Sequence, residues 1–165
     1  MAVYIILGLS LLGLAVAFFY SSSVKQVAID MGVEDNDVKA RLAKIHAAIA
    51  AGAMAFLKQE YKFMAIFMVV FGAIIAVLID DHHTEYVNEG IYTAAAFIFG
   101  AIISIASGFI GMKIATQGNV RTTVSANKSL SDAFNLALHS GSVMGFALVS
   151  LACLGLLLCT WDSNT

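Results

Sequence analysis

Residues 91–112 read IYTAAAFIFGAIISIASGFIGM, a run without a single Asp, Glu, Lys, Arg or His. A bilayer core about 30 Å thick is crossed by roughly 20 apolar residues in a helix. Inside lipid the backbone must satisfy its own hydrogen bonds, and a helix does so within one segment. The stretch therefore predicts a membrane-spanning helix, and this prediction decides the fold class.

Three further apolar runs surround this stretch, at residues 2–20, 63–79 and 141–161. The whole chain is 60% apolar and 12% charged and has no proline, whereas soluble domains are typically about 25% charged. This composition excludes an ordinary soluble enzyme, a disordered tail and a basic nucleic-acid binder. We predict an all-α membrane protein with one transmembrane region over residues 1–165, four spans in the lipid bilayer and no nucleic-acid partner.

The first run has a second interpretation, as a cleaved signal peptide. It lacks the basic residues that precede the apolar part of such a peptide, and it exceeds their usual length of roughly 7–15 apolar residues. We therefore favour a membrane span at residues 2–20.

Residues 38–61, VKARLAKIHAAIAAGAMAFLKQEY, continue the second span toward the N-terminus. Asp35 or Asn36 can cap a helix here, and apolar residues recur at helical spacing. An amphipathic surface helix would need bulky anchors, but one face is rich in alanine, which suits close helix contacts. We therefore expect one long helix from about residue 38 through the span at 63–79.

The nine Lys and Arg residues all lie in two segments, residues 21–62 and 113–140. The segment between the second and third spans carries Asp80, Asp81, Glu85 and Glu89 instead. The positive-inside rule then places loops 21–62 and 113–140 in the cytoplasm and both termini outside.

Small residues mark the third span, where Gly100, Ser104 and Gly108 recur four residues apart. This spacing lets helix backbones approach closely. General packing is the simplest explanation, and it implies that further helices or copies surround this helix.

The four predicted spans contain no Asp, Glu, Lys, Arg or His. Ionisable groups at membrane depth mark ion paths and substrate sites, so these spans alone predict no such path. Four other features of the sequence have a structural interpretation. Asp80-Asp81-His82-His83 is interpreted as a solvated turn rather than a metal site, since adjacent side chains diverge. Cys153 and Cys159 are six residues apart and favour packing over a redox pair. His46 is expected to pack on a helix, and His139 to lie at the membrane interface.

Residues 118–123, GNVRTT, suggest a loop with one glycine, Arg121 and two threonines that could contact phosphate. The spacing is not that of a P-loop. An arginine at the cytoplasmic end of a helix also anchors it and complements its dipole, and we favour that role. We thus predict no catalytic, cofactor-binding or metal-binding residue in this chain.

Three motifs, in order, resemble those of membrane-bound, ion-translocating pyrophosphatases. They are GAMAFLKQEYK at 52–62, GFIGMKIATQGNVRT at 108–122 and SGSVMGF at 140–146. The resemblance implies a pump of about sixteen helices in two concentric rings, working as a homodimer. Such a pump hydrolyses magnesium pyrophosphate at the cytoplasmic side, with Mg²⁺ as cofactor, and moves H⁺ or Na⁺ outward.

The family's hallmark motif, Asp-Val-Gly-Ala-Asp-Leu-Val-Gly-Lys, is absent from this sequence. The resemblance therefore implies the first four, outer-ring helices, with the remaining helices of the pump as partners. We expect an N-terminal part, a truncated product or half of a split pump, inactive alone. The alternatives are a self-associating four-helix structural or channel-like protein and an accessory subunit of a transporter.

Overall fold

The structure, a computed structural model, describes residues 2–29, 35–79 and 89–161. Within these ranges the chain folds into four α-helices and no strand: α1 (Ala2–Gln26), α2 (Asn36–Leu78), α3 (Glu89–Lys128) and α4 (Leu130–Trp161). All four are long and apolar enough to cross a membrane. The predicted all-α membrane class is confirmed.

The second helix is unbroken over 43 residues, which corresponds to roughly 64 Å. It begins where the side chain of Asp35 accepts a hydrogen bond of 2.9 Å from the backbone N–H of Asp37, an N-cap that satisfies one of the free donors at a helix start. The helix therefore contains the extension expected from about residue 38 and the span expected at 63–79 except its last residue, Ile79, which is the C-cap.

The structure corrects the expectation of a loop at residues 113–140. Helix α3 continues to Lys128, α4 starts at Leu130, and Ser129 alone separates them. The Ser129 hydroxyl accepts a hydrogen bond of 3.4 Å from the N–H of Asp132 and so caps α4. The segment stays helical because it contains no proline and because its apolar side chains, such as Ile114 and Val124, are buried in the structure. In the other cytoplasmic segment, residues 21–26 extend α1, while residues 36–62 belong to α2, in which a helix was expected from about residue 38.

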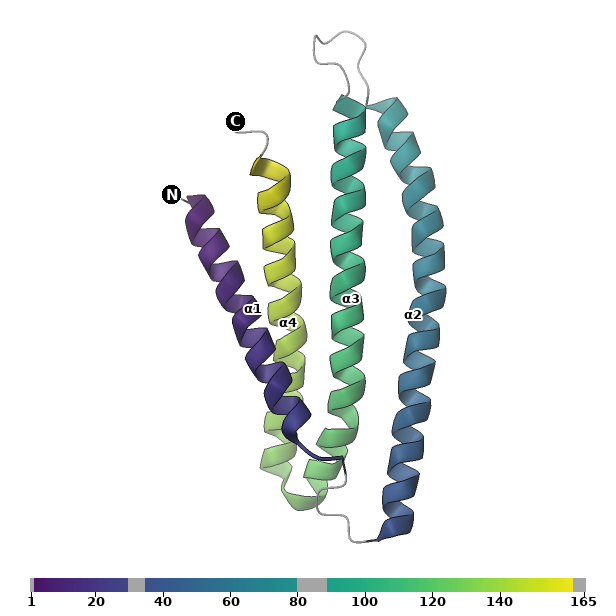
Figure 1. Cartoon of the computed structure of the whole chain (residues 1–165), viewed down its shortest axis with the longest axis vertical. Coiled ribbons are helices and arrows are strands. Elements are labelled where there is room, and N and C mark those ends of the chain that lie inside the picture. Colours follow the sequence, from purple (N-terminus) through teal and green to yellow (C-terminus); the bar gives the residue numbers. More distant parts are fainter. Residues whose placement is uncertain (1, 30–34, 80–88, 162–165) are drawn as a thin grey trace.

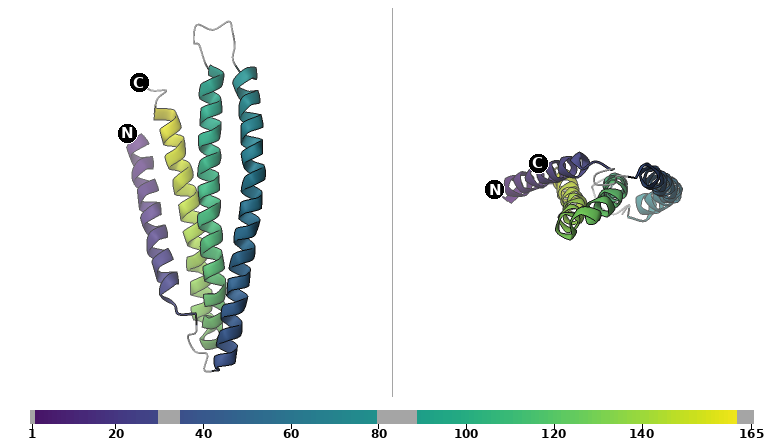
Figure 2. Two further views of the ribbon diagram at one scale, coloured as in Figure 1. Left: turned by 45° about the vertical axis from the view of Figure 1, so that its right-hand side comes forward. Right: turned by 90° about the horizontal axis from the view of Figure 1, so that it is seen from below.

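The helices form one open layer in the order α1, α4, α3, α2 (Figure 1). Helix α4 packs on both α1 and α3, and α3 also packs on α2. Among the described residues, α1 makes no contact with α2 and touches α3 over only a few residues. The end-on view in Figure 2 shows that the row does not close into a bundle.

The buried core is correspondingly small. Its principal cluster comprises Ala17, Val24, Ile114, Leu136, Val143 and Ala147, from α1, α3 and α4. Most large apolar side chains remain exposed, including Phe18 at 77% and Val77 at 76%. Exposed apolar surface on this scale is typical of helices that face lipid or further helices.

The layer has two chemically different ends. At one end, the lower one in Figure 1, α1 and α3 stop and α2 and α4 start. We call this the basic end, because Lys25, Lys39, Arg121 and Lys128 lie there. The described part of the opposite end, with the start of α1, Leu78, Glu89 and the end of α4, contains no Lys or Arg.

Candidate functional site

Helices α3 and α4 pack tightly at Gly118 and Ser140. A Cβ atom at Gly118 would collide with the side chain of Ser140, including its Cβ at 2.9 Å. The buried Ser140 hydroxyl donates a hydrogen bond of 3.3 Å to the carbonyl of Ile114. A Cβ atom at Gly111 would likewise lie only 3.1 Å from the side chain of Met144. Small residues thus bring the two backbones together where no larger residue fits.

Helix α1 is fixed to α4 by a similar contact and by an aromatic one. Gly13 faces Ser150, whose hydroxyl occupies the space that a Cβ would need. Nearer the basic end, the ring of Tyr20 stacks on His139 with centroids 4.6 Å apart. His139 lies within α4 and packs against α1.

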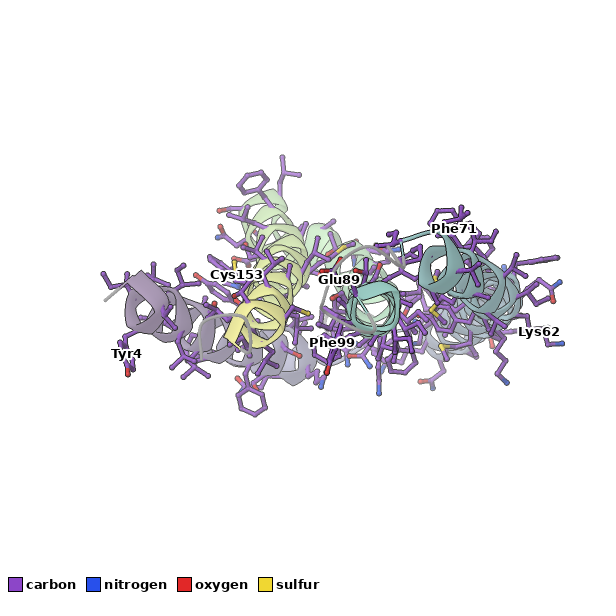
Figure 3. The ribbon with its side chains drawn as sticks, turned by 90° about the horizontal axis from the view of Figure 1, so that it is seen from above. Tyr4, Lys62, Phe71, Glu89, Phe99 and Cys153 are labelled. Carbon is purple, nitrogen blue, oxygen red and sulfur yellow. The ribbon has the colours of Figure 1, made fainter. Side chains whose placement is uncertain are left out.

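Helix α2 is fixed to α3 by a hydroxyl and by aromatic rings. The Tyr61 hydroxyl donates a hydrogen bond of 3.0 Å to the carbonyl of Ile105. Phe67, Phe71 and Phe97 form a cluster with centroids 5.2 to 6.3 Å apart. Lys62 projects outward from α2 on the side away from α3 (Figure 3). His46 lines a small pocket between α2 and α3, together with Thr116 and Asn119.

Within residues 118–123, the segment considered for phosphate contact, Arg121 makes a long-range hydrogen bond. Its Nε donates a hydrogen bond of 2.9 Å to the carbonyl of Val27, just after α1. Its NH1 donates a second hydrogen bond of 2.9 Å to the carbonyl of Gln117. Residues 118–123 are helical, so their N–H groups bond within α3 and do not form a phosphate cradle. Arg121 lies outside the predicted span. Partial burial removes water from its guanidinium group and so lowers its pKa from the ordinary value. The guanidinium group nevertheless stays charged at neutral pH. The arginine ties the end of α1 to α3.

A polar pocket of about 260 Å³ opens beside this tie, lined among others by Ser23, Lys128, Asp132 and His139. It combines one ammonium with one carboxylate. A polyanion such as pyrophosphate needs several cations or metal ions around it, so this pocket alone does not suit it.

Within the described ranges, no three His, Cys, Asp or Glu side chains gather so that they could hold a metal ion. The four residues Asp80 to His83 lie outside the described residues. Cys153 is half-buried and Cys159 exposed, and both thiols are free.

The interhelical contacts of Tyr61, Ser140 and Ser150 were missed in the sequence. The sequence does show the two kinds of residue involved, which are hydroxyl side chains in one apolar run and glycines in another. Nothing in one sequence says which glycine faces which hydroxyl, because that depends on the helix order and rotation.

Comparison with known proteins identifies the family. The family model for inorganic H⁺ pyrophosphatase matches residues 11–164. A K(+)-insensitive pyrophosphate-energized proton pump of Chloroflexus aurantiacus is 34% identical over 168 aligned positions, which cover 94% of this chain and 21% of that protein. The pump of the same name from Methanosarcina mazei is 35% identical over 145 positions, covering 88% of this chain and 19% of that protein.

A third relative, from Clostridium tetani, is a candidate K(+)-stimulated pyrophosphate-energized sodium pump. It is 44% identical over 105 positions, covering 64% of this chain and 14% of that protein. The chain thus spans about a fifth or less of the length of these relatives. Three findings agree: the motifs that match in order, the four helices of membrane-spanning length, and the family match over nearly the whole sequence. The chain therefore belongs to the inorganic H⁺ pyrophosphatase family.

Proposed function

We propose that this chain forms part of the outer wall of a membrane pump that couples pyrophosphate hydrolysis to outward transport of H⁺ or Na⁺. The observation that carries the proposal is the open layer: four membrane-length helices pack side by side in a row and leave apolar faces exposed. A wall of a larger assembly has this form, since its uncovered faces are available to the helices that complete it. Membership of the inorganic H⁺ pyrophosphatase family indicates that the larger assembly is a pyrophosphate-driven pump.

The remaining helices supply the chemistry in this proposal. The predicted spans contain no ionisable group that would carry an ion. Pyrophosphate carries several negative charges, and its hydrolysis requires Mg²⁺ and cationic groups to neutralise them. We assign the substrate, Mg²⁺ and the ion path to the rest of the pump, which the family resemblance implies is a homodimer. No residue of this chain is proposed as catalytic or as a metal ligand.

The proposal includes an orientation, with the basic end in the cytoplasm and both ends of the chain outside. All nine Lys and Arg residues lie in the parts of α1, α2 and α3 that lead from the predicted spans to the basic end. Positive residues near span ends are retained on the cytoplasmic side. Pyrophosphate would then be hydrolysed on the side that the long basic ends of α2 and α3 face.

The test is a complementation experiment on phosphate release from Mg²⁺-pyrophosphate. The 165-residue chain is expressed alone and together with the complementary four-fifths of the Methanosarcina mazei pump. We expect no phosphate release from the chain alone, and release above that of the complementary part alone when both are present. Phosphate release by the purified chain itself would contradict the proposal, because it would require a site within these four helices.

A further inference from the structure

The polar pocket beside Arg121 lies at the basic end, where three helices meet, and we call it the three-helix pocket. Its polar lining residues are Ser23 on α1, Ser125 and Lys128 on α3, and Asp132, Asn135 and His139 on α4. Its volume of about 260 Å³ is just below the roughly 300–1,000 Å³ of pockets that hold drug-sized ligands. The pocket therefore suits a small ligand that carries polar groups.

Several of the polar groups in the three-helix pocket have no protein partner. Among the described residues, the Lys128 ammonium and the Asp132 carboxylate form no ion pair. Ser125 is only 9% exposed, and its hydroxyl makes no hydrogen bond within the described part of the chain. The hydroxyls of Ser22 and Ser107, by contrast, each donate to the carbonyl four residues earlier. A nearly buried hydroxyl is costly to leave without a partner, and a ligand in the pocket would supply one.

The length of α4 places the three-helix pocket at the depth of lipid headgroups. The helix has 32 residues, or roughly 48 Å, which is close to the 40–45 Å of a bilayer with both of its headgroup layers. Large apolar side chains are still exposed in its first turns, with Leu130 at 83% and Phe134 at 65%. Such side chains are more stable against a membrane than in water. The turns that hold Asp132 and His139 therefore lie in the headgroup layer at the basic end.

The charges of the pocket select a zwitterionic ligand. Lys128 can neutralise one phosphodiester, but Asp132 would repel a ligand that carries negative charge alone. A ligand with an ammonium group beside its phosphate pairs with both side chains through charge-assisted hydrogen bonds. A quaternary ammonium has no N–H to donate to Asp132, and the described lining contains no Phe, Tyr or Trp that would surround such a group. The chemistry thus favours a phosphodiester joined to a primary ammonium.

The order of the polar groups matches a lipid that enters from the membrane side. On α4, Asp132 lies seven residues farther from the predicted span at 141–161 than His139 does, or roughly 10 Å. In a phospholipid the glycerol lies nearest the acyl chains, the phosphate follows, and the amine is at the outer end. Side chains tilt toward the N-terminus of their helix, which directs Lys128 on α3 back toward the membrane, where the phosphate would lie.

We propose that the three-helix pocket binds the headgroup of a phosphatidylethanolamine-type lipid. Lys128 and the Ser125 hydroxyl donate to the phosphate, and Asp132 accepts from the primary ammonium. His139 lines the end of the pocket nearest the glycerol. The bound headgroup would join α1 to α3, which touch over only a few residues in the protein alone. Pockets between membrane helices are known to hold lipid headgroups. The inference goes beyond the proposed function and does not depend on it, because it concerns lipid and not pyrophosphate.

The first test measures lipid preference by native mass spectrometry. The purified 165-residue chain in detergent is mixed with equal amounts of phosphatidylethanolamine, phosphatidylcholine and phosphatidylglycerol that have the same acyl chains. We expect roughly fivefold more bound phosphatidylethanolamine than either other lipid, the effect of one favourable solvent-accessible ion pair. Equal binding of all three lipids, or a preference for phosphatidylglycerol, would overturn the inference.

Substitutions in the same assay locate the bound lipid. Asp132→Asn removes the partner of the ammonium, so the binding of phosphatidylethanolamine should fall roughly fivefold, to the level of phosphatidylcholine. Lys128→Met should weaken the binding of both lipids, because both carry the phosphate. The matched controls are Asp37→Asn and Lys44→Met, which remove the same charges at exposed positions of α2. If the pocket variants bind lipid like the controls, the lipid does not occupy this pocket.

Nuclear magnetic resonance of the histidine rings tests the source of the ligand. When phosphatidylethanolamine replaces part of the phosphatidylcholine in nanodiscs, we expect the signals of His139 to shift and those of His46, which lies between α2 and α3, to stay in place. Equal shifts of both would indicate a general effect of the bilayer and would refute the site. Soluble glycerophosphoethanolamine, the same headgroup without acyl chains, should leave His139 unchanged in phosphatidylcholine nanodiscs. A shift as large as that with the lipid would assign the pocket to a free zwitterion and overturn the lipid assignment.

Discussion

At the residue scale, Gly118 sets the distance between α3 and α4. A methyl group there would meet the Ser140 side chain, so we expect Gly118→Ala to destabilise the chain by about 1–3 kcal/mol through overpacking. Gly141→Ala is the matched control, because its Cβ meets nothing and the change improves helix propensity. The measurement is the free energy of unfolding of the chain in mixed detergent micelles with increasing SDS.

The double variant Gly118→Ala with Ser140→Gly separates steric overlap from other effects. It removes the side chain against which the new methyl group collides, so we expect it to recover part of the lost stability, as a coupled pair should. Strictly additive losses would show that Gly118 and Ser140 do not contact each other.

Arg121 acts at the same scale by holding the end of α1. Its Nε donates to the carbonyl of Val27, beyond the last turn of α1, where carbonyl groups lack partners within the helix. We predict that Arg121→Met, which retains much of the apolar stem, costs about 1–2 kcal/mol. Amide hydrogen exchange at residues 24–27 should then be faster by roughly tenfold. Lys128→Met, a change of the same charge at the same end of α3, is the control, and equal acceleration by both variants would contradict the specific role of Arg121.

At the element scale, α2 is an uninterrupted helix that extends far past its predicted span. Spin labels at Lys44→Cys and Lys62→Cys, in a variant without Cys153 and Cys159, test this continuity. The two positions are 18 residues apart, which is five helical turns, so the labels share a face and their backbones should be roughly 27 Å apart. Electron–electron double resonance on the chain in nanodiscs measures the separation. A distribution centred well below this value would show a break between the extension and the span.

At the scale of the whole molecule, the layer is polarised by charge. If the basic end is cytoplasmic, Lys128→Cys should react with a membrane-impermeant maleimide only after permeabilisation. Glu89→Cys should react in intact cells. Both variants are made in a background without Cys153 and Cys159. The opposite pattern would mean that the layer is inserted with its basic end outside, contrary to the positive-inside rule.

The sequence by itself determined the membrane class, the number of long helices, the continuity of α2 and the family. These follow from composition and from local order along the chain: a run such as residues 91–112 must be helical in lipid whatever its neighbours are. The segment at residues 113–140 was expected to be a loop because it lies between two apolar runs, and this expectation was wrong, since α3 and α4 continue through it. Gly118 lies within α3 and allows close packing against Ser140 instead of forming a turn.

Tertiary structure decided the row order of the helices and the partners of individual side chains. That α4, not α2, separates α1 from α3 depends on which small faces fit together, for example Gly13 against Ser150 and Gly118 against Ser140. Such fits depend on helix rotation and on separations of more than twenty residues in the sequence, which hydropathy does not encode. For the same reason the sequence showed a stripe of small residues around Gly100, but only the packed helices show which of those residues are covered and which face open space.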